Sequence, residues 1–97
     1  MMVEAKECQD NVVYVGKKFY MRYVAALLMK FNYFKCSKVI VKARGKAISK
    51  AIHATKVFID TFNNDVRYGN INLGSMNIDI EGRRFRLSTI EIELLRF

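Results

Sequence analysis

Hydrophobic and polar residues alternate with two different periods along this chain, and the changes of period divide it into six elements. The run NVVYVG (11–16) is β-branched, short and closed by a glycine, which is typical of a strand. In KKFYMRYVAALLMKFN (17–32), apolar residues recur at the three- and four-residue spacing of a helix. This helix is apolar almost all round, so we expect it to be buried on more than one side or to meet a partner.

The same strand–helix unit follows a second time. KCSKVIVKA (35–43) has the composition of a buried strand, and RGKAISKAIHATKVFIDTF (44–62) begins with an Arg-Gly turn and continues with helical spacing. The polar triplet NND (63–65) interrupts the pattern and predicts the end of the second helix.

Two strand-like runs close the chain around a short turn. The first covers 66–80, and we expect bulges or bends at Gly69 and Gly74 within it. The segment EGRR (81–84) is the expected turn, and FRLSTIEIELLRF (85–97) is the last strand.

The predicted order is therefore β-α-β-α-β-β, which favours the α+β class: a two-layer domain with two helices on one face of a four-stranded sheet and an extended hairpin at the end. A chain of 97 residues suits one domain, which we place at 11–97. Residues 1–10 are polar and are expected to form a flexible tail rather than a secretory signal. No apolar run reaches the length of a membrane span, so no membrane partner is expected.

The two cysteines, Cys8 and Cys36, lie far apart and lack the spacing of a metal site. We expect reduced thiols in a cytosolic protein, with Cys8 in the tail and Cys36 packed as a small apolar residue at the start of a strand. Neither a disulfide nor a metal site is expected.

Charge is distributed unevenly. The net charge is +8, and between residues 11 and 59 there are eleven lysines and arginines without one Asp or Glu. A long stretch of one sign creates a strong positive field, which indicates a polyanionic partner.

Basic residues concentrate where each predicted strand turns into a helix. Helix N-termini offer unpaired N–H groups to phosphate, and both turns should lie at one edge of the sheet. Arg44 adds a planar guanidinium that can donate two hydrogen bonds to a phosphate, and Gly45 lets the backbone come close to that phosphate. The expected nucleic-acid-binding body consists of Lys17, Lys18, Arg22, Lys42, Arg44, Gly45, Lys46 and Lys50.

Residue types that support catalysis are present but are not arranged for it. His53 is the only histidine and falls on a basic helix face, where solvent or phosphate contact is expected. Glu91 and Glu93 share a strand face and are expected to form surface ion pairs rather than an acid/base dyad. The sequence contains no phosphate-binding loop and no dinucleotide motif. We predict a binding protein, not an enzyme, with no cofactor and no small-molecule substrate.

Three blocks, NVVYVGKK, IVKARGKAISKAI and GRRFRLSTIEIEL, resemble the Alba family of archaeal chromatin proteins in order and separation, over residues 11–96. The resemblance implies a fold like the C-terminal domain of a bacterial translation initiation factor. It also implies a homodimer, or a heterodimer with a paralogue, that binds double-stranded DNA and often RNA with little sequence preference. The implied location is the cytoplasm, on the chromosome.

The resemblance also implies that the last hairpin is an arm that reaches toward the minor groove. Gly82 would make the turn, and Arg83, Arg84 and Arg86 would contact phosphates and the groove edge, where arginines sense width more than base identity. Phe85 would either pack on the neighbouring strand, which we favour, or touch the nucleic acid.

The same resemblance implies two further roles, and the sequence departs from the family pattern at two places. Lys17 matches a lysine that is acetylated in some members, where loss of charge would weaken phosphate contacts. Phe62 matches an aromatic position used between dimers along DNA, although core packing explains it equally well. Phe19 replaces a frequent proline, and Tyr33 and Phe34 replace a glycine turn. The added aromatic surface would alter the contact between dimers or offer stacking to single-stranded RNA.

Three functions stay open at this point. The first is a chromatin protein that coats and compacts DNA, and the second is an RNA-binding subunit of a ribonucleoprotein such as a ribonuclease P-type particle. The third is a protein-interaction module that uses the apolar first helix. Charge reversal at Lys17, Lys18 and Arg44 should leave only the third function intact.

Overall fold

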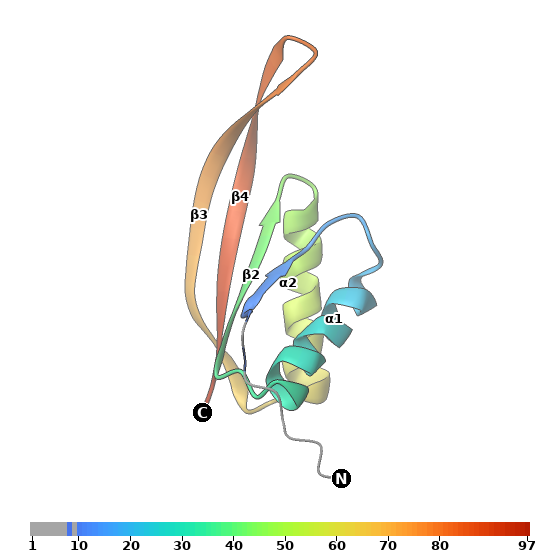
Figure 1. Ribbon diagram of the computed structural model, residues 1–97, viewed down its shortest axis with the longest axis vertical. Coiled ribbons are helices and arrows are strands. Elements are labelled where there is room, and N and C mark those ends of the chain that lie inside the picture. The colour runs from blue at the N-terminus through green and yellow to red at the C-terminus, as the bar shows by residue number, and fades with distance from the viewer. Residues whose placement is uncertain (1–7, 9) are drawn as a thin grey trace.

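The computed structural model describes Cys8 and residues 10–97, and it has two layers from which one hairpin projects (Figure 1). The elements follow in the predicted order: β1 (Val12–Tyr14), α1 (Tyr20–Leu28), β2 (Lys38–Arg44), α2 (Ala47–Val57), β3 (Val66–Ile80) and β4 (Arg83–Arg96). Both helices cover the same face of one four-stranded sheet (Figure 1). The α+β class and the two-layer arrangement predicted from the sequence are therefore confirmed.

Each helix ends in a wider, π-helical turn. The segment η1 (Met29–Tyr33) continues α1, and η2 (Phe58–Phe62) continues α2. Within these turns Phe31 and Phe58 are fully buried, and their rings stack with centroids 5.5 Å apart. The two helices are thus joined at one end by an aromatic pair. No helix among the described residues has both the length and the apolar character needed to cross a membrane.

The sheet has the order β1-β2-β4-β3, in which β1 and β2 are parallel and the other neighbours are antiparallel. Val13 lies opposite Val41, and Val41 lies opposite Ile92, so one apolar row crosses three strands. All three side chains are buried under the helices. Because side chains alternate along a strand, Lys42 and Arg44 point to the other face of the sheet.

The long hairpin of β3 and β4 contains one irregularity. The strand register shifts between Tyr68 and Ile71, where the N–H of Asn70 donates to Glu93 Oε1 at 3.2 Å. The bulge predicted at Gly69 is therefore confirmed. There is no bulge at Gly74, which pairs in regular register with Thr89.

The turn of the hairpin is shorter than the predicted segment 81–84. Ile80 pairs with Arg83, so only Glu81 and Gly82 make the turn, with φ of 51° and 77°. Positive φ at both central residues is the signature of a type I′ turn, whose twist matches that of the strands. Arg83 and Arg84 are consequently strand residues.

Cys8 and Cys36 form a disulfide, with their Cα atoms 5.0 Å apart. The expectation of two reduced thiols is therefore wrong. Cys36 is buried as predicted, but it precedes the strand, which begins at Lys38 rather than at residue 35. Sequence spacing could not reveal the pairing, because the two cysteines are 28 positions apart and no ligand or redox motif includes them. The remainder of the predicted flexible tail, 1–7 and residue 9, lies outside the described residues.

Candidate nucleic-acid interface

The two strand-to-helix loops lie at one end of the body, the end from which the hairpin projects (Figure 1). This follows from the topology, because β1 and β2 are parallel and their carboxyl ends meet at the same edge of the sheet. The loop before α1 and the loop before α2 are therefore neighbours, as the sequence predicted.

Between these loops lies a shallow hollow of about 630 Å³, which we call the lysine hollow. Its lining includes Lys17, Lys18, Lys46 and Lys50, together with Phe19, Tyr20, Ser49 and His53. Within the part of the chain that the structure describes, none of these four lysines pairs with a carboxylate. The hollow thus combines uncompensated positive charge with aromatic side chains.

The loop before α1 is fixed by two side chains. The hydroxyl oxygen of Tyr23 accepts hydrogen bonds from the N–H groups of Gly16 at 2.9 Å and Lys18 at 3.1 Å. Lys50 Nζ donates to the carbonyl oxygen of Gly16 at 2.8 Å. Lys50, expected as a phosphate ligand, therefore also holds the loop that carries Lys17 and Lys18.

The loop before α2 depends on Gly45. Its φ is 56°, a left-handed conformation that glycine adopts without strain. The N–H of Gly45 donates to the carbonyl oxygen of Ser88 at 2.8 Å, which ties this loop to β4 at the root of the projecting hairpin. The lysine hollow and the arm are thereby connected through one backbone hydrogen bond.

Lys42 and Arg44 do not line the lysine hollow, so the single basic patch predicted from the sequence is divided into two sets. They line a second hollow of about 830 Å³, which also includes Tyr14, Met76 and Glu91. Lys42 Nζ lies 3.1 Å from Glu91 Oε1, and this hydrogen bond and charge raise the pKa of the Lys42 ammonium above its usual value. Arg22 is exposed on α1 and lines neither hollow.

The division has a simple physical reason. Lys42 and Arg44 belong to a strand, where alternate side chains point to opposite faces. Lys46 is the N-cap residue of α2 and Lys50 lies within α2, the helix that covers the other face. Sequence proximity placed them together, but the alternation within β2 separates them.

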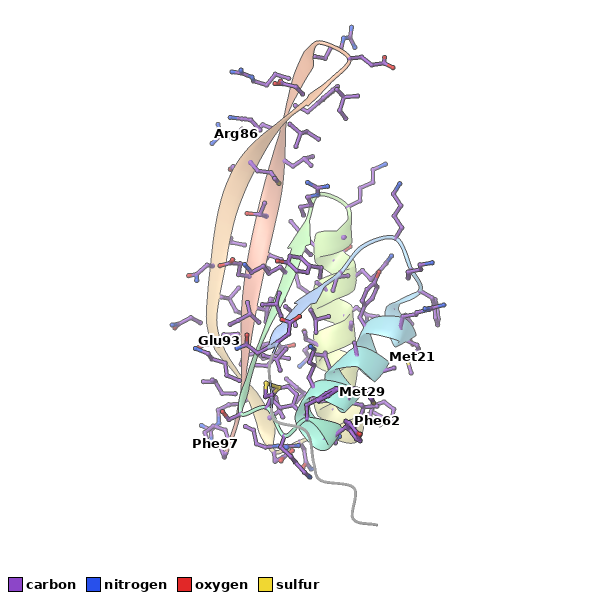
Figure 2. All side chains as sticks on the ribbon, viewed as in Figure 1. Met21, Met29, Phe62, Arg86, Glu93 and Phe97 are labelled. Atoms are coloured by element: carbon purple, nitrogen blue, oxygen red, sulfur yellow. A yellow bond between two sulfur atoms is a disulfide. The ribbon has the colours of Figure 1, made fainter. Side chains whose placement is uncertain are left out.

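The three arm arginines are exposed along the end of the hairpin, and Figure 2 labels Arg86 there. Arg84 and Arg86 share one side of β4, while Arg83 lies on the opposite side. Arg84 Nε lies 3.6 Å from Asp79 Oδ1, an exposed pair that holds the guanidinium weakly. Phe85 pairs across the hairpin with Ile78, as expected for cross-strand packing, yet its ring stays partly exposed.

The acidic residues near the interface form surface ion pairs, as predicted. Glu91 pairs with Lys42, and Glu93 Oε2 lies 3.7 Å from Lys38 Nζ. His53 is exposed, and its ring meets that of Tyr20 edge-on at 4.5 Å. The described residues contain no group of three or more His, Cys, Asp or Glu side chains suited to a metal ion.

Sequence reasoning missed an apolar strip formed by Ile52, Ile71 and Leu73. Ile71 lies opposite the buried Ile92, so its side chain is on the helix side of the sheet. It is nevertheless 51% exposed, and Leu73 is 79% exposed.

The strip continues onto α2. Thr55 Oγ1 and Tyr68 Oη form a hydrogen bond of 2.8 Å where α2 meets β3. The exposed Ile52 lies one turn before Thr55 on the same helix face. The signal in the sequence is the apolar alternation of Ile71 and Leu73 within the strand-like run 66–80.

The Alba family model matches residues 11–75 of the chain, which include both loops and the first part of the hairpin. This chain belongs to the Alba family. It is 46% identical over 88 residues to the DNA/RNA-binding protein Alba of Methanococcus maripaludis, a match that covers 90% of this chain and 99% of that protein. It is 40% identical to the DNA/RNA-binding protein Alba of Picrophilus torridus, with 91% and 98% covered.

Solved Alba structures agree with this assignment. The Alba of Thermoplasma volcanium superposes with a TM-score of 0.84 at 40% identity, and the match covers 89% of this chain and 100% of that one. ALBA1 of Trypanosoma brucei, at 23% identity and a TM-score of 0.66, shares the fold. The resemblance found in the sequence blocks is therefore confirmed.

Proposed function

We propose that this Alba-family protein binds double-stranded DNA, and also RNA, through charge and shape rather than base sequence, and that it coats and compacts the chromosome in the cytoplasm. The observation that carries the proposal is the position of the lysine hollow beside the arm: unpaired lysines and arm arginines lie at the same end of the molecule. The names of the relatives, which are DNA/RNA-binding proteins, support it. In this function the protein is a binder and not an enzyme.

Phosphate neutralisation supplies the affinity. Lys17, Lys18 and Lys46 have no carboxylate partner in the described structure, so they lose no existing ion pair when they meet phosphate. Their loops are already fixed by Tyr23 and Gly45, which limits the entropy lost on binding. The arm arginines extend this surface toward the minor groove.

The apolar strip supports a second part of the proposal, a homodimer. Ile71 and Leu73 lie on the helix side of the sheet and Ile52 lies on α2. All three side chains are exposed, and no helix in the described part of the chain covers them. A two-fold axis would place the same strip of a second copy against them, since a symmetric dimer uses one self-complementary patch. A paralogue with a matching strip would form a heterodimer in the same way.

Two residues carry finer proposals. Lys17 lies in the hollow, so its acetylation would remove one phosphate contact and lower affinity. Phe62 is the last residue of η2; it is half-exposed and absent from the buried core, which supports a contact between dimers along DNA.

The experiment is a competition between a duplex DNA and a structured RNA of equal length, repeated over a series of salt concentrations. The wild type is compared with a variant in which Arg83, Arg84 and Arg86 are alanine. In the matched control, the exposed residues Lys35, Lys38 and Lys56 are alanine, so net charge falls equally. They lie near the start of β2 and the end of α2, which are at the end of the body away from the arm (Figure 1).

We expect log K for duplex DNA to fall linearly with log salt, by a slope of about −0.9 for each phosphate contacted. The arm variant should lose affinity and have a slope shallower by up to about 3 units, one for each arginine. The control variant should change the affinity and the salt slope far less. Clear preference for structured RNA, or an arm variant that binds DNA unchanged, would favour the RNA-binding subunit of a ribonucleoprotein, and a flat salt dependence would exclude the electrostatic mechanism.

A further inference from the structure

Phe19 is the most unusual member of the lysine hollow. Its side chain is 69% exposed, although it lies among residues of a structured loop. Its ring centroid is 4.7 Å from that of Tyr20, and the Tyr20 ring is in turn 4.5 Å from His53. One side of the Phe19 ring is thus supported by a second aromatic ring, while most of its surface meets solvent.

Neither folding nor helix capping accounts for this phenylalanine. Phe19 is absent from the hydrophobic core, whereas its neighbour Tyr20 packs against that core. Phe19 occupies the N-cap of α1 and makes no side-chain capping hydrogen bond. Because Ser, Thr, Asp or Asn at an N-cap stabilises a helix and a large apolar residue does not, this position is weaker for folding than it could be.

The surroundings of Phe19 point to a nucleotide. Lys17 and Lys18 precede it, and Lys46 and Lys50 line the same hollow from the start of α2. A nucleotide presents a flat aromatic base next to a phosphate, and proteins bind unpaired nucleotides by combining an aromatic platform with a positively charged groove. Both components are present here within one hollow.

We propose that Phe19 is a stacking platform for an unpaired base, in a bulge, a loop or a single strand, whose adjacent phosphates contact Lys17, Lys18 and Lys46. Tyr20 supports the ring from behind, and His53 supports Tyr20. A base inside a regular duplex is already stacked on both faces, so it gains nothing from this ring. The inference rests on the proposed function and adds a preference for nucleic acid that contains unpaired nucleotides.

The test compares a fully paired RNA duplex with the same duplex carrying one bulged nucleotide, and a DNA pair of the same design. A 2-aminopurine at the bulge reports stacking by its fluorescence. The proteins are the wild type, Phe19→Ala, Phe19→Tyr, and Phe97→Ala as a control. Phe97 is 68% exposed, almost as much as Phe19, but lies at the opposite end of the body from the arm (Figure 2).

We expect the wild type to bind the bulged duplex roughly 5- to 100-fold more tightly than the paired one, since stacking on an aromatic side chain contributes on that scale for each base. Phe19→Ala should abolish this preference and the fluorescence change, yet keep its affinity for the paired duplex. Phe19→Tyr and Phe97→Ala should behave as the wild type does. Equal preference for RNA and DNA bulges supports recognition of base and phosphate alone, and preference for the RNA bulge alone supports RNA as the natural source.

Two results would overturn the inference without touching the proposed function. One is a wild type that binds paired and bulged duplexes equally but with the expected salt dependence. The other is a Phe19→Ala variant that retains the full bulge preference. By contrast, a wild type that binds none of the four nucleic acids would refute the proposed function itself.

Discussion

The hydroxyl oxygen of Tyr23 lies 2.9 Å from the backbone nitrogen of Gly16 and accepts its hydrogen bond across the loop that connects β1 to α1. The same oxygen accepts a second bond from the N–H of Lys18 at 3.1 Å. One side chain on α1 therefore sets the backbone path of the residues that carry the lysine pair. The same hydroxyl oxygen therefore stabilises the fold and positions the lysines of the hollow.

Tyr23→Phe should weaken both stability and binding. The substitution leaves two N–H donors without their acceptor, and we expect the free energy of unfolding to fall by about 1–2 kcal/mol. Affinity for duplex DNA should fall several-fold, because the loop must then be ordered on binding. Urea unfolding and a binding titration at fixed salt measure the two effects. Tyr14→Phe removes an exposed hydroxyl that has no hydrogen bond in the described structure, and it should change neither quantity.

Glu81→Asn should stabilise the end of the arm. Glu81 has a φ of 51°, which is unfavourable for glutamate, and Asn-Gly is the preferred pair for a type I′ turn. We expect a gain of about 0.5–1 kcal/mol. Amide hydrogen exchange at Ile80 and Arg83, which pair across the turn, would detect it as slower exchange.

Glu81→Gln is the matched control for this change, since it removes the same charge without favouring the left-handed conformation. If both variants slow exchange equally, charge rather than backbone conformation limits the stability of the turn. A stiffer arm in the asparagine variant should also raise affinity for duplex DNA beyond that of the glutamine variant.

The predicted dimer can be tested at Leu73. Leu73→Asp places a charge on the apolar strip, and we expect the protein to sediment as a monomer at micromolar concentration because an unpaired charge at an interface is strongly unfavourable. Ile80→Asp is the control, since Ile80 is also an exposed apolar residue of β3 but lies at the turn of the arm. A dimer that survives Leu73→Asp would place the subunit contact elsewhere.

The sequence predicted the fold well because each element has a strong period and a distinct boundary. The helical spacing of Ala51, Thr55 and Phe58 and the alternation of Ile90 with Glu91 depend only on local geometry. Boundaries moved by a few residues where caps are weak, as at Phe19, where no side-chain bond marks the start of the helix.

The site was predicted less completely because it depends on which face each residue occupies. Lys42 and Lys46 are four residues apart in sequence, but the change from strand to helix separates them in space. The exposure of Leu73 depends on how far α2 extends across the sheet, which no local pattern encodes. Likewise, the disulfide requires the N-terminal segment to return to Cys36, a long-range contact without a sequence signature.

That disulfide leads to the last prediction, which concerns stability alone. A crosslink between residues separated by 28 positions restricts the unfolded chain, and the chain-entropy relation gives about 3.6 kcal/mol for a loop of this size. Reduction of the wild type, or Cys8→Ser, should lower the free energy of unfolding by about that amount. Urea unfolding with and without dithiothreitol measures the difference.

Nucleic-acid affinity should stay unchanged in the same reduced protein and in Cys8→Ser. The disulfide lies near the start of β2, at the opposite end of the body from the arm (Figure 2), and neither cysteine lines either hollow. Cys8→Ser should also show no further response to dithiothreitol, since its Cys36 has no partner for a disulfide within the chain. Equal unfolding free energies for the oxidised and reduced wild type would contradict the crosslink as a source of stability. A loss of affinity on reduction would instead show that the N-terminal segment communicates with the lysine hollow across the length of α1.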